Sequence, residues 1–121
     1  MTDEPSAEGE HPIVKLVNAI LLSSVKKGAD AICIRRGGAA AEVEFASRGG
    51  PFEHELAPPL RLFDAIVRRL AVMASLPYRR HDEVARGTIH LVVAGERHYR
   101  WEIEVGGQGD TTAVVLRRHL E

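Results

Sequence analysis

Apolar residues recur along the chain with two spacings, and each spacing predicts one type of element. Between Pro12 and Lys27 they follow the i, i+3, i+4 pattern of a single buried helix face. A proline in the first turn, lysines in the last turn and Gly28 directly afterwards favour the same helix. The predicted buried positions are Ile13, Leu16, Val17, Ile20, Leu21, Ser24 and Val25.

A second helix is predicted over residues 59–75, because Pro59 suits a helix start and Pro77 cannot continue a helix. Its apolar positions also fall on one face. They are Leu62, Phe63, Ile66, Val67, Leu70, Met73 and Ala74. The stretch 77–86 is polar and is predicted to be a loop.

Elsewhere apolar and polar residues alternate, which is typical of half-buried strands. The predicted strands cover residues 31–35, 41–46, 52–56, 88–93, 98–105 and 112–117, with 52–56 as an edge strand. A three-residue loop at 94–96 allows two strands to share one apolar face. That register places Ile89 opposite Trp101 and Leu91 opposite Tyr99.

Together these elements predict an α+β fold, in which two main helices cover one face of a mostly antiparallel sheet of five to six strands. The chain has 121 residues, which is typical of one domain. Residues 1–10 are acidic and nearly devoid of apolar side chains, so we expect a disordered tail there. The single α+β domain is expected over residues 11–121.

Composition narrows the function classes. The net charge is -1 and only 5% of residues are aromatic, which disfavours nucleic acid as a partner. The chain has one cysteine, and its N-terminus does not read as a signal peptide. The longest apolar stretch runs from Ala19 to Leu22, far short of a membrane span. We therefore expect a cytoplasmic protein that is peripheral at most to a membrane.

Few residues suggest chemistry. The glycine-rich segment 106–111 lacks the lysine of a phosphate-binding loop, and Cys33 is expected to be a buried or half-buried apolar group. His90 and His98 fall in diagonal register, but the histidines show no metal-ligand spacing. We expect no catalytic, cofactor or metal site, and hence no enzyme. Paired arginines can anchor a protein interface, and the alternative interpretation is a solubilising role at the surface. The candidate partner-binding residues are Arg35, Arg36, Arg68, Arg69, Arg79 and Arg80.

Part of the chain resembles a known family. Residues 12–22 read PIVKLVNAILL and residues 27–34 read KGADAICI. They are similar to the opening of the N-terminal, non-catalytic domain of type II secretion and type IV pilus assembly ATPases. Weaker similarities follow in order at residues 43–49, 69–74 and 113–117. The resemblance implies a PAS-like fold in a standalone, degenerate domain. It also implies a protein partner, either a secretion or pilus ATPase domain or a second copy of the chain.

Several polar positions depart from that family. Asp30-Ala31-Ile32-Cys33 stands where the family has Ser-Asp-Ile-His, and Glu44 and Ala46 replace two arginines. No Walker motif is present. The resemblance therefore implies docking without ATP hydrolysis. Two alternatives are a PAS-like regulatory or ligand-sensing module, and an enzyme of unknown chemistry.

Overall fold

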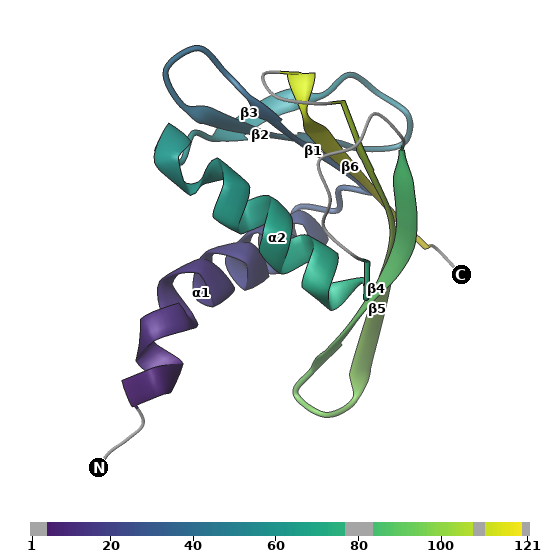
Figure 1. Cartoon of the computed structure of the whole chain (residues 1–121). Coiled ribbons are helices and arrows are strands. Elements are labelled where there is room, and N and C mark those ends of the chain that lie inside the picture. The colour runs from purple at the N-terminus through teal and green to yellow at the C-terminus, as the bar shows by residue number, and fades with distance from the viewer. Residues whose placement is uncertain (1–4, 77–83, 108–110, 120–121) are drawn as a thin grey trace.

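In the computed structural model both helices lie on one side of a single sheet (Figure 1). The structure describes residues 5–76, 84–107 and 111–119, with side chains from Pro12 onward. The predicted α+β class, with six antiparallel strands and two main helices, is confirmed. The elements are α1 (Pro5–Lys26), β1 (Ala31–Arg36), β2 (Ala41–Ala46), β3 (Glu53–Leu56), the 3-10 helix η1 (Leu60–Leu62), α2 (Phe63–Met73), β4 (Ala85–Val93), β5 (Arg97–Gly106) and β6 (Ala113–Arg118).

The sheet has the order β3-β2-β1-β6-β5-β4, and every neighbouring pair is antiparallel. It consists of two meanders, β1-β2-β3 and β4-β5-β6, joined where β1 pairs with β6. In that central pair Ile34 lies opposite Val114, and Ile32 lies opposite Leu116. The first and last strands of the chain therefore hold the two halves of the sheet together.

The core fills the space between the sheet and the two helices. Trp101 and Phe63 are its largest fully buried side chains. Every second residue of β1, β2, β5 and β6 points inward, as strand geometry requires. Burying a large apolar side chain contributes about 1.5–3 kcal/mol. The other large buried residues include Leu21, Ile32, Ile34, Ile66, Leu70, Ile89, Ile103 and Leu116.

Helix α1 begins at Pro5, so the predicted start at Pro12 is wrong, and residues 5–10 are helical although a tail was expected there. Pro12 lies inside the helix. A proline removes one backbone hydrogen bond, but the alanine and glutamates before it are tolerated in a helix, and Pro5 suits the first turn. The C-terminal end agrees with the prediction. Gly28 has a φ of 73°, and the Ala29 amide donates to the Ser24 carbonyl at 2.9 Å.

Strand β4 begins at Ala85, so the last part of the loop predicted over 77–86 is wrong. Ala85, Gly87 and Ile89 continue the inward alternation of the strand, while Arg86 and Thr88 between them point outward. Residues 77–83 lie outside the described part of the chain. The register predicted for the β4-β5 hairpin is confirmed, since Ile89 pairs with Trp101 and Leu91 pairs with Tyr99.

Candidate functional site

The outer face of the sheet is open, because both helices cover the other face (Figure 1). Residues that alternate with the buried positions point outward from each strand. The outward residues of β2 and β5 include Glu42, Glu44, Glu102 and Glu104. Charges from neighbouring strands therefore meet on one open surface.

Arg35 lies at the centre of one cluster on this face. Its Nη2 is 3.2 Å from Oε1 of Glu42 and 3.1 Å from Oε2 of Glu44. The hydrogen bond to Glu44 raises the already high pKa of Arg35. Cys33, on the same face of β1, is half-buried as expected. Burial, followed by the charge of Glu44, raises the pKa of the Cys33 thiol above its ordinary value of 9.0.

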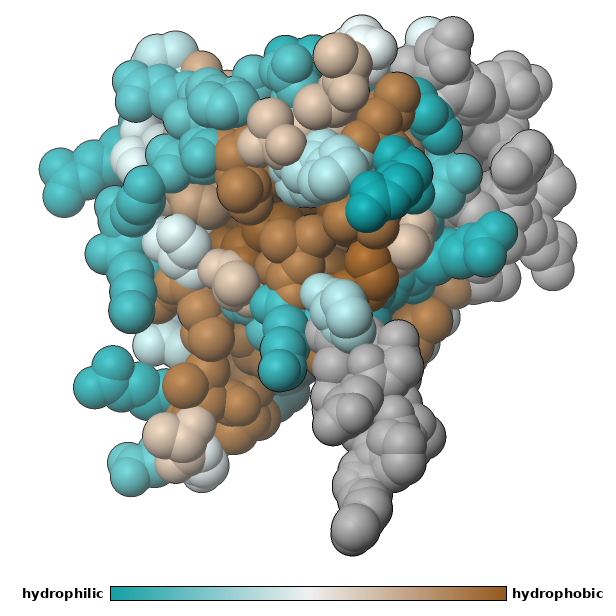
Figure 2. Space-filling model, turned by 90° about the vertical axis from the view of Figure 1, so that its left-hand side faces the viewer, coloured by the Kyte–Doolittle hydropathy of each residue, from teal (hydrophilic) through white to brown (hydrophobic). Residues whose placement is uncertain are grey.

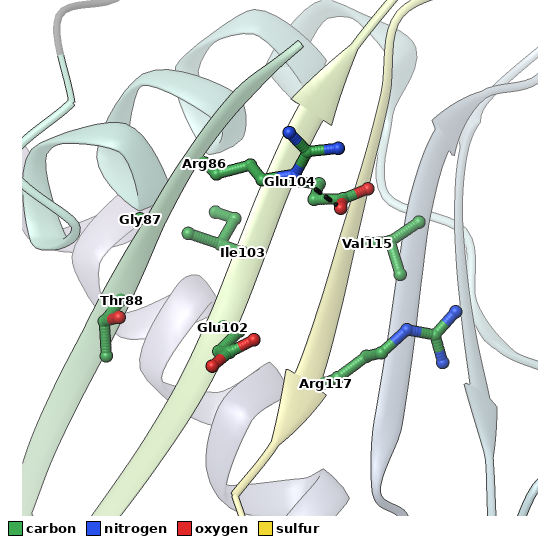
Figure 3. A pocket seen from close by; sticks show the side chains of 8 residues that line it. All are labelled: Arg86, Gly87, Thr88, Glu102, Ile103, Glu104, Val115 and Arg117. Atoms are coloured by element: carbon green, nitrogen blue, oxygen red, sulfur yellow. Dashed lines mark hydrogen bonds and ion pairs between the residues drawn. The ribbon is translucent and has the colours of Figure 1, made fainter.

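A hollow of about 280 Å³ lies on the same face, over β4, β5 and β6. Figure 3 views it with the helices behind the strands. Nε of Arg86 donates to Oε2 of Glu104 at 2.9 Å, while Glu102 and Arg117 project from neighbouring strands (Figure 3). Oε2 of Glu102 also lies 2.8 Å from Nε2 of His119. The lining residues are Arg86, Gly87, Thr88, Glu102, Ile103, Glu104, Val115 and Arg117.

A second hollow, of about 430 Å³, lies at one end of the strands, beside the start of β1 and the ends of β2 and β6. Small residues form part of it, since Ala31 and Ala46 lie side by side in the β1-β2 pairing. Arg117 and the partly exposed Phe52 also line it. The remaining lining residues are Asp30, Gly49, Gly50 and Arg118.

Among the described residues, the arginines predicted to bind a partner do not converge on one surface. Arg35 joins the outer-face cluster described above. Arg36 turns towards α2, where its Nη2 lies 3.1 Å from Oδ1 of Asp64 and its guanidinium carbon lies 5.0 Å from the centre of the Phe63 ring. Arg68 and Arg69 are on α2, the former exposed and the latter half-buried. The last pair, Arg79 and Arg80, lies outside the described residues.

The polar groups described above are joined mainly by ion pairs. Among the described residues, no group of three histidine, cysteine, aspartate or glutamate side chains is placed to hold a metal ion. The sequence analysis missed the pairing of Arg86 with Glu104 because it placed Arg86 in a loop. The alternation of Ala85, Gly87 and Ile89 was the signal that would have extended the strand.

The fold and this surface define a small α+β domain whose outer face carries several ion pairs within the chain. The chain belongs to the family described as Type II/IV secretion system protein, which it matches over residues 6–118. It is 32% identical over 99 residues to the type IV pilus assembly ATPase PilB of Myxococcus xanthus (strain DK1622). That alignment covers 82% of this chain but 17% of the relative, so the chain spans only a small part of that protein. The resemblance drawn from residues 12–34 is thereby confirmed.

One structural finding bears on the membrane. No helix within residues 5–76, 84–107 and 111–119 has the length and apolar character needed to cross a bilayer.

Proposed function

We propose that this chain is a non-catalytic docking domain that binds a type II secretion or type IV pilus ATPase, or another component of such a machine. The observation that carries the proposal is the family match over residues 6–118, which covers a small share of a much longer ATPase relative. In this proposal the partner supplies the catalytic machinery.

The absence of familiar catalytic groups supports the same proposal. The sequence has no GxxxxGK[ST] segment, and the glycine-rich residues 106–111 contain no lysine. The acidic residues of the outer face are committed to ion pairs, notably Glu42 and Glu44 with Arg35, and Glu104 with Arg86. Cys33 does not suit a nucleophile, because a raised pKa leaves little thiolate at neutral pH.

The helical side offers a surface suited to a protein partner. Figure 2 shows an apolar area in the middle of the face that carries the beginnings of α1 and α2, with hydrophilic residues around it. Partly buried apolar residues of these segments include Ile13 and Leu16 on α1, and Leu60 and Leu62 in η1. An apolar centre with a polar rim is typical of protein interfaces. Arg68 and Arg69 on α2 lie on this helical side of the sheet.

A PAS-like ligand-sensing module is the second candidate. The hollow of about 430 Å³ favours it, because Arg117 and Phe52 together offer a charge and an aromatic ring. The space between the sheet and the helices does not favour a ligand-sensing module, because buried side chains such as Trp101, Phe63 and Ile66 fill it. Calorimetric titration with a panel of small anions and nucleotides tests this candidate, and docking remains the favoured function.

A binding titration tests docking. The purified chain is titrated against a type II secretion or type IV pilus ATPase of the same organism, with phosphate release followed in parallel. We expect saturable binding and no phosphate release from the chain alone. Charge reversal at Arg68→Glu with Arg69→Glu should weaken binding by about tenfold or more. The matched control Arg86→Glu lies on the opposite face and should leave binding unchanged. No binding to any such ATPase, or turnover of ATP by the chain alone, contradicts the proposal.

A further inference from the structure

Two imidazole rings meet on the outer face of the β4-β5 hairpin, apart from the ion pairs described above. His90 on β4 pairs with Arg100, and His98 on β5 pairs with Val92, so the two histidines are diagonal neighbours. Nε2 of His90 lies 2.8 Å from Nδ1 of His98. The ring centroids are 5.0 Å apart with an interplanar angle of 30°. Both side chains are exposed.

The hydrogen bond between the two rings requires a lone pair on one of the two facing nitrogens. A protonated imidazole has only donor nitrogens, so two imidazoles hydrogen-bonded to each other include at least one unprotonated nitrogen. A neutral imidazole binds a metal ion through such a lone pair, so the ring that donates in this contact must carry its proton on its other nitrogen when both rings bind one metal. Neither ring belongs to the buried core. Small rotations of these two exposed rings therefore disturb no buried packing.

The nitrogen–nitrogen distance indicates which metals fit. An imidazole nitrogen lies about 2.0–2.1 Å from a bound metal, so two ligands at a right angle are about 2.9 Å apart, and two at the tetrahedral angle about 3.3 Å. The observed 2.8 Å is the distance of the hydrogen bond between the rings, and it is close to the right-angle spacing, so the two nitrogens can reach that spacing with little movement. Square-planar and tetragonal nitrogen–oxygen coordination is typical of Cu²⁺ and Ni²⁺. The geometry points to a two-imidazole chelate site at His90 and His98 for a late divalent transition metal, with Cu²⁺ bound most tightly and water completing the coordination.

The neighbouring charges affect how tightly His90 and His98 would bind a metal ion. Arg100 is opposite His90 and opposes the binding of a dication, while Glu102 is hydrogen-bonded to His119 at 2.8 Å. Within the described residues, no third histidine, cysteine or carboxylate completes a cluster with the pair. Water therefore occupies the remaining coordination positions of the metal ion. Removal of the Arg100 charge should strengthen metal binding. We expect Arg100→Gln to tighten Cu²⁺ binding by about two- to threefold at low salt.

The test is a Cu²⁺ titration of the chain without an affinity tag, followed by calorimetry and by electron paramagnetic resonance. We expect one tight Cu²⁺ per chain with two imidazole nitrogens in the pulsed spectrum. His90→Gln or His98→Gln should each weaken binding by about tenfold or more, since a chelate becomes a single ligand. His54→Gln is the matched control, because His54 is exposed on β3 at the far edge of the sheet and should not matter.

A second readout separates the metal site from a folding effect. Ni²⁺ should raise the melting temperature of the unmodified chain by mass action and leave that of the double variant His90→Gln/His98→Gln unchanged. Without metal, all variants should melt alike, because the substituted side chains are exposed. Equal Cu²⁺ affinity in the double variant and the unmodified chain overturns the inference. So does a spectrum with one imidazole nitrogen, or an equal loss in His54→Gln.

Discussion

Arg36 illustrates how a charged residue can serve the fold although its position in the sequence suggests a surface role. It lies on the inward-facing side of β1, in alternation with Ile32 and Ile34, and reaches α2, where it contacts both the Phe63 ring and the Asp64 carboxylate. A guanidinium over an aromatic face adds about 0.5–1 kcal/mol at an exposed site, and the partly exposed ion pair adds little. Its aliphatic stem also covers apolar surface.

We expect Arg36→Ala to lower the free energy of unfolding by about 1–2 kcal/mol, measured by urea denaturation. The matched control is Arg61→Ala, since Arg61 is exposed in the adjoining 3-10 helix and should change stability by no more than about 0.5 kcal/mol. Equal losses in the two variants would show that the contact with Phe63 and Asp64 contributes nothing.

The surroundings of Cys33 affect how fast its thiol reacts. Because burial and the Glu44 charge raise the pKa of the thiol, its alkylation at pH 8 should be slower than that of a free cysteine. Glu44→Gln removes the neighbouring negative charge and should accelerate alkylation by roughly two- to fivefold. Glu104→Gln is the control, as Glu104 lies on the same face beyond β6. An unchanged rate in Glu44→Gln would exclude the proposed electrostatic cause.

The raised pKa of the Cys33 thiol also affects the stability of the protein at high pH. The thiol pKa is raised above 9.0 in the folded chain, so the unfolded chain loses this proton first as the pH rises. The contribution of Cys33 is therefore complete below about pH 9 and declines above it. Cys33→Ala should show a shallower loss of stability in urea denaturation as the pH rises above about 9. A steeper loss of stability with rising pH in Cys33→Ala would contradict the raised pKa of the thiol.

At the scale of elements, the β4-β5 hairpin depends on two residues of left-handed conformation in its turn. Ala94 has a φ of 56° and Gly95 a φ of 75°. Alanine is disfavoured there, whereas glycine adopts the conformation without strain. We expect Ala94→Gly to stabilise the protein by about 0.5 kcal/mol and Gly95→Ala to destabilise it by about 1 kcal/mol. Thermal melting distinguishes these opposite signs, and a shared sign would contradict the turn conformation.

The sequence predicted local elements better than their assembly. Periodicity placed both helix faces and the hairpin register of Ile89 with Trp101, because each depends on neighbouring residues. It did not predict that β1 pairs with β6, since these strands are far apart in sequence and no turn links them. The position of Arg36 against Phe63 was missed for the same reason. Proximity of His90 and His98, by contrast, followed directly from the hairpin register.

At the scale of the whole molecule, β6 is the element on which both halves of the sheet depend. It lies between β1 and β5, with Leu116 opposite both Ile32 and Ile103. A chain truncated after Thr112 should therefore lose cooperative unfolding, as judged by calorimetry and near-ultraviolet circular dichroism. Val115→Ala, at a half-buried position on the outer face, is the control and should retain a cooperative transition. A cooperative transition in the truncated chain would contradict the central role of β6.

The central claim is that this member of the secretion family acts by docking to an ATPase. Hydrogen–deuterium exchange of the chain, alone and with a saturating type II secretion or type IV pilus ATPase, tests that claim most directly. We predict slower exchange on the helical side, in α1 and α2, with little change in β4 and β5 on the far half of the sheet. Identical exchange with and without the ATPase would contradict the claim.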